Sequence, residues 1–292
     1  MFTRLCSLWY TMKSSQQLSY ISIAFASWKL LILLVAKLAP GLGYDTSTTL
    51  LPSTNKLVRW DAIYYVEITR RGHVFEQEWA FDGLSSALAV ISHGGLETTI
   101  LTAVCVAHVS HYFSVILLWN IASSLYDEKS FVPFITACLH VISPAGVFLS
   151  APYSEGPFAC LNMLGFWIYV QAWKSKPQMS QSLRCLSLIV SGIVFGCATT
   201  IRANGILSGI PFLLDAVYVG LQVLQGINQP SATVMHLLLL ASTTLGGICI
   251  AGGLVLPQYL AYQEYCVEWS SHRSWCHNTL PLVYSYVQSH YW

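Results

Sequence analysis

The run Arg59-Trp60-Asp61 places a carboxylate directly after a tryptophan, not far beyond the first long apolar segment of the chain. A carboxylate close to low-dielectric lipid has its pKa raised, because burial disfavours the charged form. Such a group suits a general base that takes the proton of a hydroxyl nucleophile. An acid at a helix N-cap or on a solvated surface has the same spacing, so these three residues alone leave both interpretations open.

Two more polar groups interrupt apolar sequence in the second half of the chain. Tyr153, Ser154 and Glu155 follow a proline-containing stretch, and a carboxylate at a membrane edge usually has a partner or a task. Arg202 and Asn204 stand between two apolar runs with almost no loop. The guanidinium of Arg202 matches a phosphate through paired hydrogen bonds. The alternative for the first group is a plain linking turn. The alternatives for Arg202 are a side chain that snorkels to the interface and a salt bridge to Glu155.

The chain ends in a stretch of polar and aromatic side chains. Gln288 and His290 lie there among tyrosines and a tryptophan, a composition that suits a sugar or lipid-headgroup site. The spacing alone is weak support, because a lone histidine is more often structural. The other histidines form no HxxxH or HExxH pattern, and the cysteines have no zinc-ligand spacing. The sequence therefore assigns no metal site.

The composition indicates which elements must position these residues. Of 292 residues, 54% are hydrophobic and 9% are charged, with a mean hydropathy of +0.55. A soluble chain carries roughly 25% charged residues, so this one requires a bilayer. The net charge of +1 provides no basic field of the kind that binds nucleic acid. We expect a single membrane domain built as an all-α, polytopic helical bundle.

Seven apolar stretches approach the ~20 residues that a transmembrane helix needs. They are residues 18–38, 98–122, 131–150, 157–173, 183–201, 203–224 and 234–256. The first is interpreted as a retained signal anchor rather than a cleaved signal peptide, since its apolar core is long and no clear cleavage site follows. Residues 39–97 then form a long polar loop that contains Asp61, residues 98–256 form the rest of the bundle, and residues 257–292 form a polar tail.

The positive-inside rule orients this bundle. It places the N-terminus, with Arg4 and Lys13, in the cytoplasm. The long polar loop, both interrupting polar groups and the tail then lie together on the opposite, lumenal side. Cys266 and Cys276 share that tail, and we expect them to form a disulfide in an oxidising lumen.

One side of the membrane thus offers a carboxylate, an arginine, a glutamate and many aromatic rings. Glycosyl transfer from a lipid phosphate needs such a set: a base for the acceptor hydroxyl, a cation for the leaving phosphate and rings that hold sugars. A transporter would instead place charges at the bilayer midplane and broken helices in repeat-related pairs. A polytopic transporter or lipid scramblase, and a non-catalytic assembly subunit, are the alternative hypotheses.

Five blocks, in order along the chain, resemble the GPI mannosyltransferase 2 family. They are Arg59-Trp60-Asp61-Ala62; Gly72 with Glu76–Phe81; Ser143-Pro144-Ala145 with Ser150–Glu155; Arg202-Ala203-Asn204-Gly205; and Trp275-Cys276 with Leu280-Pro281, Tyr284 and Gln288–Trp292. The resemblance spans residues 59–292, and each block lies on the side expected to be lumenal.

The resemblance implies an inverting GT-C glycosyltransferase with a large first lumenal loop, in the endoplasmic reticulum membrane. The family adds the second mannose of the glycosylphosphatidylinositol anchor, in α-1,6 linkage, from dolichyl-phosphate-mannose. Asp61 matches the loop acid that such enzymes use as catalytic base. The resemblance implies no metal and no other cofactor. The chain is also similar to a fungal enzyme that works with a small membrane partner subunit, so the resemblance implies such a partner. Substrate contacts are expected from Arg59, Trp60, Glu78, Tyr153, Glu155, Arg202, Asn204, Gln288 and His290.

Two departures from the family pattern affect these expectations. After Ala80-Phe81, where aromatics and proline are usual, the chain continues with Asp82-Gly83, so we expect a different local structure. Family members are also longer, with more spans after the block that contains Gln288. We therefore expect a C-terminally shortened chain: a fragment, a shortened gene product or an inactive protein.

Overall fold

The structure is a computed structural model that describes residues 14–40, 56–92, 94–127, 130–174, 179–225, 230–268 and 273–291. These residues form helices and turns but no strand, so the predicted all-α class is confirmed. The helices are α2 (Ser14–Leu38), α3 (Asp61–Arg71), η2 (Glu76–Phe81), α4 (Asp82–Ile91), α5 (Leu96–Leu125), α6 (Val132–Val141), α7 (Glu155–Lys174), α8 (Gln181–Ile201), η3 (Ala203–Ser208), α9 (Gly209–Gln225), α10 (Pro230–Tyr262), η4 (Gln263–Glu268), η5 (Ser274–His277) and α11 (Val283–Tyr291).

Five helices of the described chain are long and apolar enough to cross a membrane, rather than the seven predicted stretches. They are Ser14–Leu38, Leu96–Leu125, Gln181–Ile201, Ala203–Gln225 and Val234–Val267. This length and composition make the chain a multi-pass membrane protein.

The two remaining predicted stretches are not among these five helices, and the reason differs between them. The stretch expected over residues 131–150 is helical only in α6, whose ten residues are too few to span a bilayer, because a turn that contains Pro144 follows. Helix α7 is 20 residues long, but Asn162 and Gln171 interrupt its apolar sequence. The last span continues well beyond residue 256, because Pro257 lies inside α10 without ending it.

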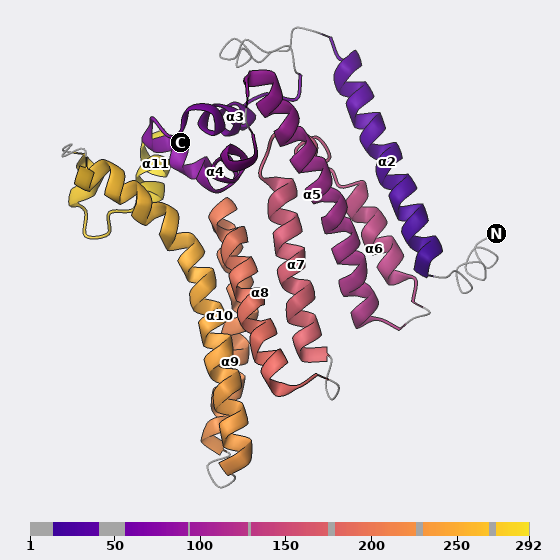
Figure 1. The fold of residues 1–292 in the computed structure, drawn as a ribbon, viewed down its shortest axis with the longest axis vertical. Coiled ribbons are helices and arrows are strands. Elements are labelled where there is room, and N and C mark those ends of the chain that lie inside the picture. The colour runs from indigo at the N-terminus through magenta and orange to yellow at the C-terminus, as the bar shows by residue number, and fades with distance from the viewer. Residues whose placement is uncertain are drawn as a thin grey trace.

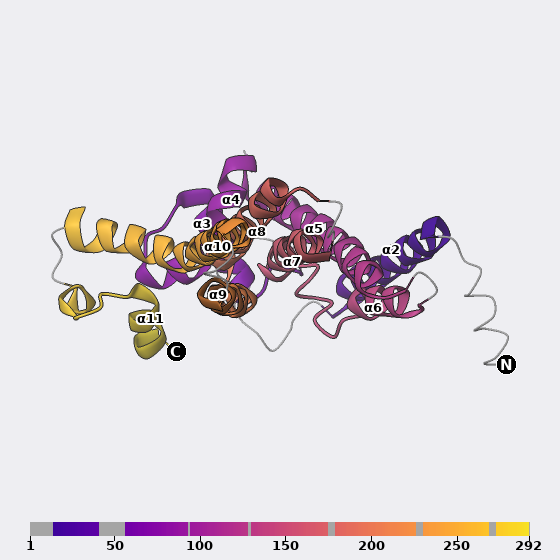
Figure 2. The same cartoon turned by 90° about the horizontal axis from the view of Figure 1, so that it is seen from below.

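The long helices run side by side, and the shorter helices α3, α4 and α11 gather at one end of them (Figure 1). Seen from below, the bundle is an elongated row that runs from α2 and α6 through α5 and α7 to α8, α9 and α10 (Figure 2). The chain passes up and down in turn, so the turn after α6 and the turn after α8 reach the same end as α3 and α4 (Figure 1). We call this the site end.

Glycines bring α8 and α10 into close contact. A Cβ at Gly192 would lie 2.3 Å from the Cα of Gly246, and one at Gly253 would lie 2.1 Å from the carbonyl oxygen of Gly196. Small residues allow membrane helices to pack backbone to backbone in this way. The contact fixes the end of α8 from which Arg202 projects.

A buried apolar cluster supports α3 and α4 at the site end. Its members include Ala62 and Val66 of α3, Leu84 and Leu88 of α4, and Ile100 of α5. Helix α4 begins at Asp82, in the stretch where the sequence departs from the family pattern. The local structure at that departure is therefore the start of a helix.

Gly83 is the point where α4 meets the end of α8. A Cβ at Gly83 would lie 2.2 Å from the carbonyl oxygen of Thr200. We expect Gly83→Ala to force the two helices apart and to lower the free energy of unfolding by about 1–3 kcal/mol, as overpacking does. Thermal unfolding in detergent measures this change. Gly220→Ala is the control, because nothing lies within 4 Å of its added Cβ; equal midpoints for the two variants would contradict the prediction.

Candidate functional site

Asp61 is the first residue of α3, and a strained turn places it there. Trp60 has φ 48° and ψ −124°, and the N–H of Ala62 donates to the carbonyl oxygen of Arg59 at 3.0 Å. These angles are close to the first central position of a type II′ turn, where glycine is preferred. A non-glycine residue held there costs on the order of 1–3 kcal/mol. Around this turn the neighbouring side chains of Trp60 and Asp61 reach different cavities. Trp60 lines an apolar groove, and Asp61 lines a polar cavity.

The polar cavity, of about 360 Å³, lies at the site end. Five of the ten predicted site residues line it, namely Asp61, Tyr153, Glu155, Arg202 and Asn204. They come from α3, from the turn before α7, from the start of α7 and from the η3 region after α8. Residues separated by more than 140 positions in the sequence therefore meet around one space.

Hydrogen bonds join the walls of the polar cavity. Arg202 Nη1 donates to Glu155 Oε1 at 2.6 Å and to Ser154 Oγ at 3.1 Å. The hydroxyl of Tyr65 donates to the same Ser154 Oγ at 2.8 Å, and the hydroxyl of Tyr153 donates to the carbonyl oxygen of Arg59 at 2.9 Å. The alternative prediction for Arg202, a salt bridge to Glu155, is thus confirmed.

The second carboxylate oxygen of Glu155 has a different environment. Glu155 Oε2 is buried and accepts no hydrogen bond from the described part of the chain. A buried acceptor without a donor costs free energy, so it favours a ligand that donates one. A sugar hydroxyl is such a donor.

Electrostatics at the site favour an acid that holds its proton more tightly than usual. Burial raises the pKa of Asp61, the charge of Glu155 raises it further, and the charge of Arg202 opposes both. Burial also raises the pKa of Tyr65 to about 12, which keeps this hydroxyl protonated as a donor to Ser154. A carboxylate of raised pKa is the kind of group that suits general base catalysis.

The raised pKa of Asp61 predicts a pH dependence. A base works only when deprotonated, so kcat/KM should fall as the pH drops through the Asp61 pKa, above the ~4 of an ordinary aspartate. Glu155→Gln removes an influence that raises this pKa and should move the acid limb to lower pH. Arg202→Gln removes one that lowers it and should move the limb to higher pH. Profiles of kcat/KM against pH measure both; shifts in the same direction would contradict the assignment.

Gln288 lines a second cavity, of about 380 Å³. The polar cavity and this one share Ala80, Ile201 and Ala203 in their walls, so they adjoin each other. Tyr284 and Val287 of α11 complete the far side. The last helix therefore extends the site beyond Asp61.

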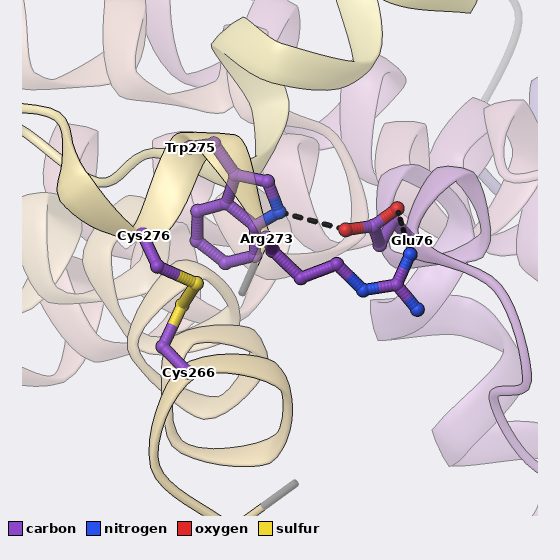
Figure 3. The surroundings of a disulfide bond; sticks show 5 residues. All are labelled: Glu76, Cys266, Arg273, Trp275 and Cys276. Carbon is purple, nitrogen blue, oxygen red and sulfur yellow. Dashed lines mark hydrogen bonds and ion pairs between the residues drawn. A yellow bond between two sulfur atoms is a disulfide. The ribbon is translucent and has the colours of Figure 1, made fainter. Parts of the chain in front are cut away.

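A buried contact anchors the tail to the first polar segment (Figure 3). Trp275 is 1% exposed, and its indole N–H donates to Glu76 Oε1 at 2.7 Å. Arg273 Nη1 lies 3.4 Å from the other oxygen of Glu76. The disulfide between Cys266 and Cys276 joins η4, which follows α10, to the same tail and confirms the predicted pairing.

The other four predicted site residues lie outside both the polar cavity and the second cavity. Arg59 and Trp60 line the apolar groove. Glu78 is buried and bonded to Arg71 and to the N–H groups of Val74 and Phe75, so it closes a turn. Burial alone would raise the pKa of Glu78, but these hydrogen bonds outweigh it and hold that pKa below its ordinary value.

His290 is exposed near the end of α11. Its ring stacks on Tyr286, with 5.1 Å between ring centroids, and it lines none of the three cavities described. The described residues contain no group of three or more His, Cys, Asp or Glu side chains arranged to hold a metal ion.

The sequence did not predict two residues, Tyr65 and Glu76, that are important to the site. Tyr65 follows Asp61 by one helical turn, so a helix that starts at Asp61 would have placed both on one face. Glu76 is 4% exposed and joins the tail, but nothing in the sequence distinguishes it from its neighbour Glu78. Its partners lie almost 200 positions away.

Comparison with known proteins places this geometry in a family. The family described as "Mannosyltransferase (PIG-V)" matches residues 42–292. The GPI mannosyltransferase 2 of Aspergillus oryzae is 37% identical over 93% of this chain and 65% of that protein, and the one of Gibberella zeae is 36% identical over 96% and 68%. The GPI alpha-1,6-mannosyltransferase 2 of Cricetulus griseus is 31% identical over 81% of this chain and 51% of that protein.

The chain spans about two thirds of the length of the fungal relatives it matches. No solved structure matches it. The family match covers most of the chain and includes every residue of the polar cavity. This chain therefore belongs to the PIG-V mannosyltransferase family.

Proposed function

We propose that the chain transfers a mannose from dolichyl-phosphate-mannose to the glycosylphosphatidylinositol precursor, forming the α-1,6 linkage of its second mannose. The observation that carries this proposal is Asp61, a carboxylate of raised pKa in a polar cavity at one end of a membrane bundle. The printed names of the relatives support the reaction and its linkage.

The proposed step is a single displacement with inversion. A hydroxyl oxygen of the acceptor attacks the anomeric carbon of the mannose, and the bond from that carbon to the phosphate oxygen breaks. The hydroxyl proton passes to the carboxylate of Asp61, and the lipid phosphate leaves with the bonding electrons. Glu155 Oε2, which lacks a donor in the described residues, accepts a hydrogen bond from a sugar hydroxyl. Arg202 holds Glu155 in place and Asn204 lines the same cavity.

The adjoining cavity suits the sugars already present on the acceptor. It opens beside the polar cavity and presents Gln288 and Tyr284, an amide and an aromatic ring of the kind that bind carbohydrate. The site end lies in the lumen of the endoplasmic reticulum in this proposal. The Cys266–Cys276 disulfide at that end supports an oxidising compartment.

Microsomal transfer tests the proposal. Membranes that contain this chain as their sole source of the enzyme receive dolichyl-phosphate-mannose with labelled mannose and a one-mannose precursor. We expect a two-mannose product that α-1,6-specific hydrolysis cleaves. We also propose a small membrane partner subunit, so a second arm co-expresses one. Absence of product in both arms, with the chain present in the membrane, would refute the assignment of activity to these 292 residues.

A further inference from the structure

An apolar groove of about 640 Å³ lies beside the polar cavity, on the other side of the turn at Trp60. One wall is the last part of α2, where Trp28, Ile32 and Val35 face the groove. The opposite wall is the turn after α6, where Gly146 and Val147 take part. The groove therefore runs along a membrane helix and ends at the residue before Asp61.

Gly146 allows the turn after α6 to lie close to α2 in the wall of the groove. A Cβ there would lie 3.0 Å from Ile32 Cδ1 and 3.3 Å from Trp28 Nε1. The N–H of Trp28 is buried and has no hydrogen-bond partner in the described residues. An apolar channel of this kind, with one donor at its side, suits a lipid chain attached to a polar group.

Two cationic side chains, Lys56 and Arg59, line the groove and differ in their contacts. Lys56 Nζ donates to the carbonyl oxygens of Lys37 and Ala39, so it closes the end of α2. The guanidinium of Arg59 makes no ion pair or hydrogen bond to the described part of the chain, although it lines the groove. Arg202, by contrast, is already bonded to Glu155 and Ser154. Arg59 is thus the cation available to a phosphate.

The position of Arg59 distinguishes two lipid phosphates. In the donor, one bridging oxygen joins the phosphorus to the carbon that reacts, so the phosphate must lie next to the base. In a glycosylphosphatidylinositol acceptor, the inositol and the sugars already attached separate the phosphate from the reacting hydroxyl. Arg59 is two residues from Asp61, which fits the first arrangement and not the second.

We propose that this groove binds the isoprenoid chain of the lipid-phosphate donor and that Arg59 binds its phosphate. This inference rests on the proposed function and adds the location of the donor lipid. The strained turn at Trp60 then connects the two sites, because it separates the phosphate at Arg59 from the base at Asp61 by one residue.

Photolabelling tests the proposal without any transfer reaction. The full chain in nanodiscs is irradiated with dolichyl phosphate that carries a diazirine on its isoprenoid chain, and labelled peptides are identified by mass spectrometry. We expect labels in residues 28–36 and 142–147. Unlabelled dolichyl phosphate should compete, whereas dolichol and phosphatidylinositol should not. Labels confined to other helices, or equal competition by phosphatidylinositol, would overturn the proposal.

Variants separate the roles of the two arginines and of the groove. Arg59→Ala should raise the concentration of dolichyl phosphate needed for half-competition about tenfold or more, as loss of a hydrogen bond to a charged group does. Arg59→Lys should recover part of this loss, and Arg202→Ala should change little. Val147→Trp should abolish labelling, while Leu213→Trp, at another exposed apolar site outside the groove, should not. A loss with Arg202→Ala in place of Arg59→Ala would contradict the proposal.

Photolabelling and the microsomal transfer assay, carried out on the same chain, together distinguish this inference from the proposed function. Labelling in the groove without mannose transfer would refute the activity and leave the lipid site standing. Transfer with labels elsewhere would refute the lipid site and leave the activity standing.

Discussion

Asp61→Asn should lower the rate of mannose transfer by about 10²–10⁴-fold, the range that general base catalysis contributes. The amide has nearly the same shape as the carboxylate but cannot accept the hydroxyl proton at this step. Because the variant keeps the volume of the side chain, dolichyl phosphate binding and thermal stability should change little. The measurement is single-turnover transfer in microsomes at saturating donor and acceptor, compared with equal amounts of the unchanged chain.

Glu67→Gln is the matched control for this variant. Glu67 lies on the same helix α3 and also changes from carboxylate to amide, but it pairs with Arg70 and Arg71 outside the polar cavity. Its transfer rate should stay within a few-fold of the unchanged chain, since surface ion pairs contribute only about 0–1 kcal/mol. Full activity of Asp61→Asn, or an equal loss in both variants, would end the assignment of Asp61 as the base.

Trp275→Phe should loosen the tail from the rest of the site end. The smaller ring removes the N–H that Glu76 Oε1 accepts, and Glu76 is 4% exposed. A buried carboxylate that loses a donor costs about 1–3 kcal/mol or more. The tail carries Gln288 and one wall of the second cavity, so the KM for the acceptor should rise while dolichyl phosphate binding stays the same.

A double-mutant cycle isolates the contact between the tail and η2. Glu76→Met, which has no acceptor oxygen, and Trp275→Phe are each compared with the double variant by thermal unfolding and by acceptor KM. If the two side chains act together, the double variant should lose less than the sum of the single losses. Strictly additive losses would show that Glu76 and Trp275 act separately, and the anchoring role of this hydrogen bond would then be wrong.

The sequence predicted the residues of the polar cavity better than the elements that hold them. Asp61, Glu155 and Arg202 could be found because charged side chains are rare in this chain and costly at a membrane edge. Their order along up-and-down helices also indicates that they meet at one end, as the structure shows. The Cys266–Cys276 pairing followed from the proximity of both residues in one polar tail.

Other features depend on contacts that periodicity and composition do not encode. Hydropathy counted α6 as a span because the apolar residues continue through the turn that contains Pro144. It also ended α10 too early, since Pro257 resembles a helix terminator but is accommodated within the helix. Glu78 matched a family block, yet it serves Arg71 and a turn rather than a cavity. The division of the chain into loop, bundle and tail stays a prediction.

The glycine contact between α8 and α10 has a consequence for biosynthesis. Helix α9 lies between the two in sequence, so the ribosome completes α8 well before Gly246 and Gly253 exist. Membrane segments emerge in order during synthesis, and a contact cannot form before its later partner has been made. Asp61, Glu155 and Arg202 are therefore all synthesised before α10 is complete, whereas the backbone contact that holds α8 forms only when α10 arrives. A translation arrest within α9 would thus leave every residue of the polar cavity in place in the chain but α8 without its packing partner.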